Sequence, residues 1–313
     1  MKKVLLIGAG NMAFEYAKVL KALGTEITVI GRSESSAAQF FAKAGIQPIQ
    51  GGLNQFLDSN LLDGYSHAIV TTGIEFLAQV TRQLVEAGMK NILLEKPGGL
   101  SLQEVQNLFQ DVHAKASIFI AYNRRFYASV LHAQEIIKED EGILSFNFEF
   151  TEWASDIEQI KKAPGVKENW FLANSSHVVD LAFFLGGKPL SMASFTAGKL
   201  NWHEPAVFTG AGRTAKSVLF SYQANWQAPG RWGVEILTAK HRLYFRPMEK
   251  LFLQKLNSIT VEEVTVDYSL ETNFKPGLYK QTDAFLNNPA HPSLCSFQEH
   301  IDTIPFYEKI ISA

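Results

Sequence analysis

The chain has 313 residues, of which 46% are hydrophobic and 19% are charged, and its formal net charge is −2. A chain longer than about 250–300 residues usually divides into two domains. The balanced charge argues against a nucleic-acid partner. No stretch approaches the roughly 18 apolar residues of a membrane span, and the run Val4–Ile7 is too short for a secretory signal, so we expect no membrane contact. A single cysteine, Cys295, excludes an intramolecular disulfide and fits a cytoplasmic location.

The first part of the chain alternates short apolar runs with amphipathic stretches. We predict strands within Val4–Ile7, Ile27–Ile30, Pro48–Ile49, Ala68–Val70, Ile92–Leu94 and Ile118–Ala121. Apolar residues at helical spacing predict helices over residues 13–23 and 76–85. Ser101 and Glu104 have the spacing of a capping box, which opens a third helix. Continuous apolar strands alternating with helices predict a parallel sheet that is covered on both faces.

Beyond about residue 140 the pattern changes to alternation. Phe146, Phe148 and Phe150 alternate with polar residues, as in a strand of an antiparallel or mixed sheet. Further strands are predicted within residues 217–223, 233–237, 242–245, 251–256 and 261–266. Helices are predicted over residues 172–185 and 278–286, and a last one starts at Ser296, which forms a capping box with Glu299.

These patterns predict an α/β fold with two domains. Residues 1–121 would form a Rossmann-type, doubly wound parallel sheet. Residues 122–313 would form an α+β domain with a large, mostly antiparallel open sheet, used for substrate binding and oligomerisation. Because strand-rich domains of this kind often associate through a sheet face, we expect a homodimer or homotetramer.

A glycine-rich turn follows the first predicted strand. Residues Gly8 to Ala13 read G-x-G-x-x-A, with Asn11 and Met12 between the second glycine and the alanine. Gly8 permits a tight turn, Gly10 lets the backbone approach a pyrophosphate, and Ala13 lets the helix pack closely on the strand. Because the turn follows a strand and opens a helix, it predicts a dinucleotide site at the helix N-terminus.

The end of the second predicted strand indicates which dinucleotide binds. NAD-specific sites place Asp or Glu there to bind the ribose 2′-hydroxyl, whereas this chain has Gly31, Arg32 and Ser33. Arg32 and Ser33 offer donors to a 2′-phosphate, and a charge-assisted hydrogen bond contributes about 1.5–3 kcal/mol. We therefore predict NADP(H), with NAD(H) as the alternative. The competing interpretation is that Arg32 is merely solvated.

Another predicted strand, Ile92–Leu94, runs directly into Glu95, Lys96 and Pro97. In open parallel sheets, ligands bind beyond the carboxyl ends of the strands. Lys96 is therefore either a solvated surface lysine or a group in a cleft that takes part in chemistry. The turn that follows it, Pro97-Gly98-Gly99, favours the cleft.

The glycine turn, Glu95-Lys96-Pro97, Tyr122–Phe126 (YNRRF) and the segment SHVVDLAFFLGG occur in an order that resembles the Gfo/Idh/MocA oxidoreductases. This is the family of glucose–fructose oxidoreductase and inositol dehydrogenase. The resemblance implies hydride transfer between a nicotinamide and a hydroxyl or keto carbon of a sugar, polyol or nucleotide-linked sugar. The alternatives are a non-catalytic NAD(P)-binding regulator and an oxidoreductase for another substrate, such as an imine.

The resemblance also implies roles for individual residues. Lys96 would hydrogen-bond the reacting oxygen, and His177 would be the general acid or base, since histidine titrates near 6.5. The expected cofactor contacts are Gly8, Gly10, Asn11, Met12, Arg32, Ser33, Thr71, Thr72, Glu95, Lys96 and Asn123. The expected substrate contacts are Asn123, Arg124, Trp170, Asn174 and Asp180.

Three positions qualify this assignment. Much of the family has an aspartate four residues before the histidine, where this chain has Ala173. Asn174 can form hydrogen bonds there but cannot take up a proton. Asp180 is either an orienting partner of His177 or a structural carboxylate.

No spacing of histidine or cysteine predicts a metal site.

Overall fold

The computed structural model describes residues 1–59 and 62–312, which form two compact units. The first unit comprises residues 1–123 and 272–302, and the remaining described residues form the second. The domains expected from the sequence, 1–121 and 122–313, were continuous spans. The units are discontinuous because a late segment joins the first sheet: β14 (Cys295–Ser296) pairs antiparallel with β5 (Ser117–Ile120).

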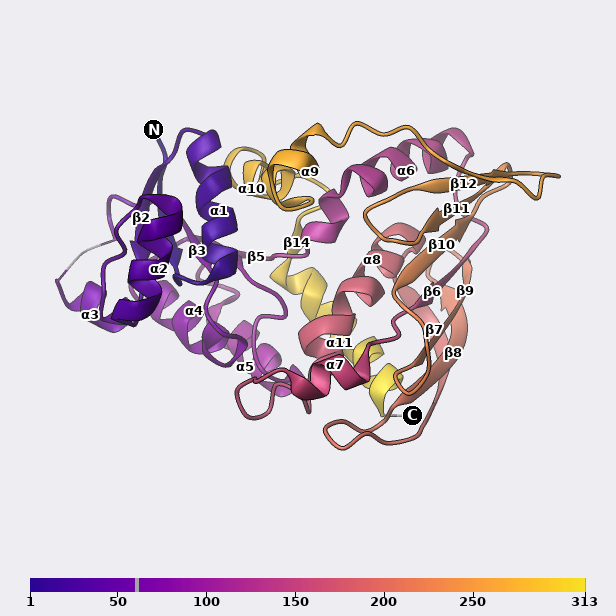
Figure 1. Ribbon diagram of the computed structural model, residues 1–313, viewed down its shortest axis with the longest axis horizontal. Coiled ribbons are helices and arrows are strands. Elements are labelled where there is room, and N and C mark those ends of the chain that lie inside the picture. The colour runs from indigo at the N-terminus through magenta and orange to yellow at the C-terminus, as the bar shows by residue number, and fades with distance from the viewer. Residues whose placement is uncertain (60–61, 313) are drawn as a thin grey trace. The chain divides into compact units, whose positions relative to one another are not determined.

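The first unit contains a sheet in the order β14-β5-β4-β3-β1-β2, parallel except for β14 (Figure 1). The parallel strands other than β5 are β1 (Lys3–Ile7), β2 (Glu26–Ile30), β3 (His67–Val70) and β4 (Asn91–Leu94). Consecutive residues of a strand point to opposite faces, and every residue of Val4–Ile7 is buried, so both faces of β1 are covered. The fold class predicted from the apolar runs is confirmed. The weak run at residues 48–49 forms only a single bridge, from Ile49 to Ile30.

Helices connect these strands and pack against the sheet. They are α1 (Asn11–Ala22), α2 (Glu34–Ala44), α3 (Gly52–Ser59), α4 (Leu77–Glu86), α5 (Leu102–Val112) and α10 (Leu278–Asn287). Helix α1 packs on α10, and α4 packs on α5. The predicted cap of α5 is present, since Ser101 Oγ accepts a hydrogen bond from the Glu104 backbone N–H at 3.2 Å.

The second unit is built on a sheet in the order β13-β12-β11-β10-β6-β9-β8-β7. Its pairs are antiparallel except β6 with β9, which is parallel, so the prediction of a mostly antiparallel sheet is confirmed. The strands are β6 (Ser145–Glu149), β7 (Pro189–Ala197), β8 (Val207–Thr214), β9 (Leu219–Asn225), β10 (Gly233–Leu237), β11 (His241–Phe245), β12 (Phe252–Lys255) and β13 (Val261–Glu263).

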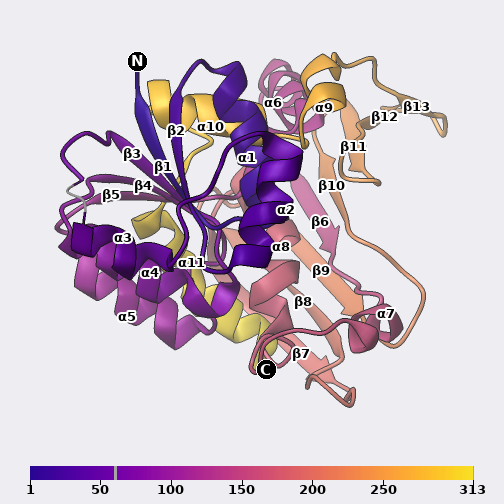
Figure 2. The same cartoon turned by 60° about the vertical axis from the view of Figure 1, so that its left-hand side comes forward.

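Alternation along β6 directs one face of this sheet into the core. Phe146 and Phe148 are buried, and both rings make edge-on contacts with Phe183 of α8 (Ser176–Gly186). Helix α8 packs against β6 and β10, as Figure 2 shows. A π-helical segment, Phe171–Ser175, leads directly into α8, so the helix predicted over residues 172–185 is two consecutive pieces.

The remaining helices are α6 (Ala128–Glu139), α7 (Ala154–Gln159), α9 (Ser269–Asn273) and α11 (Phe297–Ile311). Helix α11 starts as predicted, with Ser296 Oγ accepting from the Glu299 backbone N–H at 3.1 Å. Within residues 1–59 and 62–312, no helix is both long and apolar enough to cross a membrane.

Candidate active site

A cavity of about 470 Å³ lies in the first unit, beyond the carboxyl ends of β1, β2 and β3. Six of the predicted cofactor residues line it: Gly8, Gly10, Arg32, Ser33, Thr71 and Thr72. Parallel strands end at the same edge of a sheet, so residues that are distant in sequence meet there. Asn11 and Met12 begin helix α1 and do not line the cavity.

The two glycines of the turn differ in backbone conformation and in the space that a side chain would meet. Gly8 has a φ of +116°, and a Cβ atom there would lie 2.7 Å from Thr71 Oγ1 and 2.9 Å from the Thr71 carbonyl oxygen. Gly10 has an ordinary extended conformation, with φ −92° and ψ −171°. A Cβ atom at Gly10 would meet no atom of the chain within 4 Å. The fold therefore requires glycine at position 8, whereas the open space at position 10 is available to a ligand.

The end of β2 leads into the N-terminus of α2. Ser33 caps this helix by accepting a hydrogen bond from the Ser36 backbone N–H at 3.3 Å. The Arg32 guanidinium lies over the Phe76 ring, 4.6 Å from its centroid. Ser36, Glu75 and Phe76 also line the cavity but were not predicted from the sequence. The Ser-x-x-Ser spacing of Ser33 and Ser36, at the start of α2, is the sequence signal that indicates Ser36.

The two threonines after β3 differ in how they are bonded. Thr71 Oγ1 donates to the Ile7 carbonyl at 2.9 Å, which ties the end of β3 to the end of β1. Thr72 Oγ1 is buried and has no hydrogen-bond partner among the described residues. Thr72 therefore keeps a hydroxyl available to a bound ligand at this edge of the sheet.

Glu95 and Lys96 directly follow β4 and are both half-buried. Burial raises the pKa of Glu95, and the opposing influences are the Lys96 charge and a hydrogen bond that Tyr16 Oη donates at 3.1 Å. The Lys96–Pro97 peptide bond is cis. Asn123, also in the first unit, donates from Nδ2 to the Pro276 carbonyl at 2.9 Å.

His177 lies in the first turn of α8, in the second unit, and only 8% of its surface is exposed. Its ring centroid is 6.3 Å from that of Trp232. The Trp232 ring also contacts two cations, since the guanidinium carbons of Arg124 and Arg231 lie 4.9 Å and 4.5 Å from its centroid. Burial lowers the pKa of Arg124. These residues place a titratable imidazole beside a cationic, aromatic surface.

Asp180 forms a buried ion pair with Arg125. Arg125 Nε donates to one carboxylate oxygen at 2.9 Å and Nη2 donates to the other at 2.5 Å. Both side chains are 2% exposed. A bidentate pair of this kind fixes α8 relative to the start of the second unit. This pairing favours the structural interpretation of Asp180.

A carboxylate that was not predicted from the sequence lies next to the segment before His177. Glu152, 2% exposed, accepts from Asn174 Nδ2 at 3.0 Å and 3.1 Å and from Ser175 Oγ at 2.7 Å. Arg231 Nη1 lies 3.4 Å from the same carboxylate. Asn174 is therefore bonded to a carboxylate from another element. Ala173 itself carries none.

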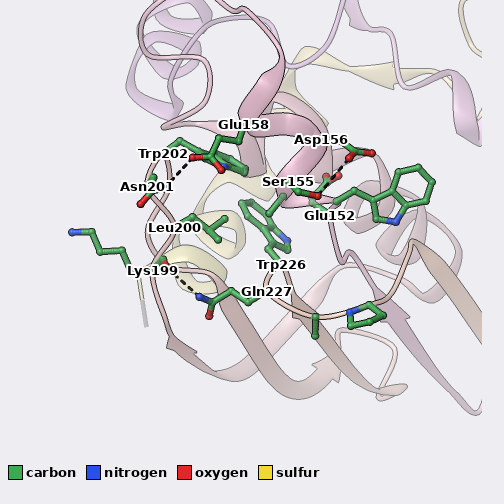
Figure 3. Close-up of a pocket in the computed structure, with 14 residues that line it drawn as sticks. Glu152, Ser155, Asp156, Glu158, Lys199, Leu200, Asn201, Trp202, Trp226 and Gln227 are labelled. Carbon is green, nitrogen blue, oxygen red and sulfur yellow. Dashed lines mark hydrogen bonds between the residues drawn. The ribbon is translucent and has the colours of Figure 1, made fainter.

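Glu152 also lines a second cavity of about 640 Å³ in the second unit. Trp202 and Trp226 are among its apolar residues, and Asp156, Glu158 and Asn201 are among its polar residues (Figure 3). Trp153 also lines it. The rings of Trp202 and Trp226 are stacked at 5.9 Å. Trp170, predicted to bind substrate, does not line this cavity but contacts the Trp202 ring edge-on at 6.1 Å.

The described part of the chain has no group of three or more His, Cys, Asp or Glu residues arranged to hold a metal ion. The cavity beyond β1 to β3 instead has the features of a dinucleotide site: a glycine turn, a helix N-terminus and strand ends. The fold and this cavity define the class as a Rossmann-type nucleotide-binding protein.

A family model matches the first part of the chain. Residues 2–122 match the model of the Gfo/Idh/MocA family, described as an oxidoreductase family with an NAD-binding Rossmann fold. The match agrees, over this region, with the resemblance drawn from the sequence motifs. The match supports an NAD(P)-dependent dehydrogenase or reductase. No curated protein matches the chain in sequence.

Solved structures show the same fold over nearly the whole chain. Levoglucosan dehydrogenase in complex with NADH and L-sorbose has a TM-score of 0.79 at 16% identity, covering 99% of this chain and 95% of that one. A putative NADPH-dependent oxidoreductase from Desulfitobacterium hafniense has a TM-score of 0.78 at 15% identity, with 99% and 94% covered. UDP-N-acetylglucosamine 3-dehydrogenase from Acidithiobacillus ferrooxidans gives 0.74 at 14% identity, with 98% and 96% covered. At these identities the similarity establishes the fold.

Proposed function

We propose that the protein transfers a hydride between NADP(H) and the hydroxyl or keto carbon of a sugar, a polyol or a nucleotide-linked sugar. The observation that carries this proposal is the cavity formed by the glycine turn and the strand ends of β1 to β3. The family match over residues 2–122 supports the nicotinamide chemistry. Two of the structural neighbours are named as dehydrogenases of sugar compounds, which supports the substrate class.

The preference for NADP(H) over NAD(H) rests on the end of β2. The cavity there offers the Arg32 guanidinium, the Ser33 and Ser36 hydroxyls and the N-terminus of α2. A helix N-terminus and a guanidinium both favour a phosphate group. Glu75 lines the same cavity and opposes this preference. A net gain of about 1.5–3 kcal/mol corresponds to about 10- to 100-fold tighter binding of NADPH.

Separate titrations with NADPH and NADH test this preference. We expect Arg32→Met to weaken NADPH binding by about 10- to 100-fold and to leave NADH binding nearly unchanged. Arg82→Met is the matched control, since Arg82 pairs with Asp111 at 2.6 Å and does not line the cavity. Equal affinities of the wild-type protein for the two cofactors would refute the NADP(H) assignment.

For the chemical step we propose Lys96 and His177 as the proton-handling groups. Hydride can leave a carbinol carbon only as its hydroxyl proton is removed, so a base has to reach that oxygen. Lys96 would hydrogen-bond the reacting oxygen, and His177 would accept or return the proton. Glu95 would hold Lys96 in place by charge attraction, since the Lys96 charge lowers the pKa of Glu95 against the larger effect of burial. Bound NADP(H) supplies the hydride or accepts it.

Measuring the absorbance of reduced nicotinamide with a panel of keto-sugars tests these roles. Lys96→Met should lower turnover by at least about 100-fold, as expected for loss of a general acid or base. Lys43→Met is the control, since Lys43 is exposed in the last turn of α2. Full activity of the Lys96→Met variant would remove Lys96 from the mechanism.

The substrate would contact Asn123, Arg124, Trp170 and Asn174. The cavity that contains Trp202 and Trp226 would hold a further part of a large substrate. Tryptophan faces suit the C–H surfaces of a sugar ring, and carboxylates and amides suit its hydroxyls. Asp180 remains a weaker candidate, because Arg125 already occupies both of its oxygens.

A second function, a non-catalytic NAD(P)-binding regulator, is favoured by Ala173, which leaves the turn before His177 without a carboxylate of its own. Tight binding of NADPH with no turnover of any carbonyl compound would support this alternative.

We also propose a cytoplasmic homodimer or homotetramer that associates through the exposed face of the second sheet. Phe195 and Leu219, 66% and 62% exposed, lie on β7 and β9. Light scattering that shows only a monomer would contradict this assembly.

A further inference from the structure

Glu152 is a buried carboxylate surrounded by donors from separate parts of the second unit. It lies between β6 and α7 in the chain and lines the cavity drawn in Figure 3. Its oxygens accept from Asn174 Nδ2 and Ser175 Oγ, at distances of 2.7–3.1 Å. Arg231, from the segment between β9 and β10, approaches to 3.4 Å. A carboxylate with this number of donors is held in one orientation.

The donors of Glu152 come from the segment just before His177 and from the residue next to Trp232. Asn174 and Ser175 end the π-helical segment, two residues and one residue before the start of α8. Arg231 immediately precedes Trp232, whose ring lies 6.3 Å from the imidazole of His177. Glu152 thus joins the backbone segment that carries His177 to the aromatic ring that lies beside it.

Burying a charged carboxylate is unfavourable. If Glu152 only linked two segments, a neutral glutamine amide at this position would serve as well. Burial is the largest influence on Glu152 and raises its pKa, while Ser175, Arg231 and Asn174 lower it. The charged groups that face Glu152 are Arg231 and, at longer range, Arg124. Asp156 and Glu158 line the same cavity. A negative charge here would raise the affinity of His177 for a proton.

We propose that Glu152 is the positioning residue for His177, fixing the imidazole and providing the carboxylate that Ala173 does not. The inference rests on the proposed role of His177 in proton transfer. Glu152 is not assigned contact with the reacting atoms. It acts through the start of α8 and through Trp232.

The test follows the titration of the His177 imidazole by NMR in the full chain labelled at histidine. His177→Asn identifies the His177 signal. Glu152→Gln keeps the size of the side chain and removes its charge, and we expect it to lower the pKa of His177 by about 0.5–1 unit. Asp156→Asn is the control from the same cavity and should leave this pKa unchanged. A merely structural role for Glu152 would leave the pKa of His177 unchanged in Glu152→Gln.

Rescue provides the second measurement. Adding Ala173→Asp to Glu152→Gln places a carboxylate one turn before His177, and we expect it to restore at least half of the pKa shift. An unchanged His177 pKa in a folded Glu152→Gln protein would overturn the inference, as would a shift of equal size in Asp156→Asn. If Glu152→Gln fails to fold, Glu152→Asp, which keeps the charge and shortens the side chain, should retain the wild-type pKa of His177. Its failure to do so would also overturn the inference.

The observations that would refute the proposed function differ from those that would refute the role of Glu152. NADPH binds in the first unit under that proposal, so all Glu152 variants should bind NADPH within about 2-fold of the wild type. Absence of NADPH binding by the wild-type protein would refute the function but would leave the His177 titration unaffected.

Discussion

Alanine substitutions at Gly8 and Gly10 should have different effects. One should mainly lower the stability of the fold, and the other should mainly lower the affinity for NADPH. At Gly10 the backbone is extended and a Cβ atom would have no neighbour within 4 Å. Gly10→Ala should therefore lower the free energy of unfolding by only about 0.5–1 kcal/mol, the usual difference between glycine and alanine at a helix N-cap. The added methyl group would, however, stand where the pyrophosphate approaches the backbone. We expect NADPH affinity to fall by about 10- to 100-fold, or about 1.4–2.8 kcal/mol.

Gly8→Ala should show the opposite balance. The methyl group would lie within 3 Å of the Thr71 side chain and backbone, at a φ of +116°. The unfavourable φ costs about 1–2 kcal/mol, and overpacking costs about 1–3 kcal/mol more. We therefore expect Gly8→Ala to lower the free energy of unfolding by about 2–5 kcal/mol.

The two quantities are measured separately, by urea denaturation without cofactor and by fluorescence titration with NADPH. Gly64→Ala serves as a control, because its Cβ atom would approach only Lys3 Cδ, at 4.0 Å, and it does not line the cavity. Wild-type NADPH affinity in Gly10→Ala would refute the placement of the pyrophosphate. A loss of stability in Gly10→Ala equal to that in Gly8→Ala would refute the geometric argument.

Further predictions concern stability. Burial, followed by the Lys2 charge, lowers the pKa of His67 from 6.5 to about 4, so the unfolded chain takes up a proton before the folded protein as pH falls from about 6.5 to about 4. His67→Gln should remove about 1 kcal/mol of this acid destabilisation, after allowance for solvent screening, when urea unfolding is compared at pH 7 and pH 4.5. A parallel loss in wild type and variant would contradict the assignment. Asp180→Asn should lower the free energy of unfolding by about 3 kcal/mol, because it leaves the Arg125 charge buried without its carboxylate partner. A loss below about 1 kcal/mol would show that the pair is not desolvated. Ser101→Ala should cost about 1 kcal/mol at the N-cap of α5, and no change in the urea midpoint would contradict the cap.

Features encoded by neighbouring residues could be predicted from the sequence. The apolar runs of the first unit became β1 to β5, because strands buried on both faces need continuous apolar residues. The Ser-x-x-Glu caps at Ser101 and Ser296 formed, since each depends only on residues three positions apart. The glycine turn likewise depends on local backbone geometry.

Strands with little apolar character were missed. β7 (Pro189–Ala197) and β8 (Val207–Thr214) contain mainly small and hydroxyl-bearing residues, and one face of each is exposed. Their pairing in the sheet, and not burial of large side chains, defines them as strands.

The part of the candidate site that depends on tertiary contacts could not be predicted. Glu152 acts with Asn174, Ser175 and Arg231, which lie 22, 23 and 79 residues further along the chain. No motif links these positions. The same holds for the Arg125–Asp180 pair, which spans 55 residues. Asp180 at helical spacing from His177 suggested a role beside the imidazole, and only the structure places Arg125 against it.

A crystal structure of the full chain with NADPH and a bound keto-sugar would test most directly whether Lys96 and His177 serve one reaction centre. The proposed function predicts the 2′-phosphate at Arg32 and Ser33 and the pyrophosphate at Gly8 and Gly10. It also predicts Lys96 Nζ and an imidazole nitrogen of His177 within about 3 Å of the sugar oxygen next to the nicotinamide ring. A complex in which NADPH lies outside this cavity, or in which either group is far from that oxygen, would contradict the account.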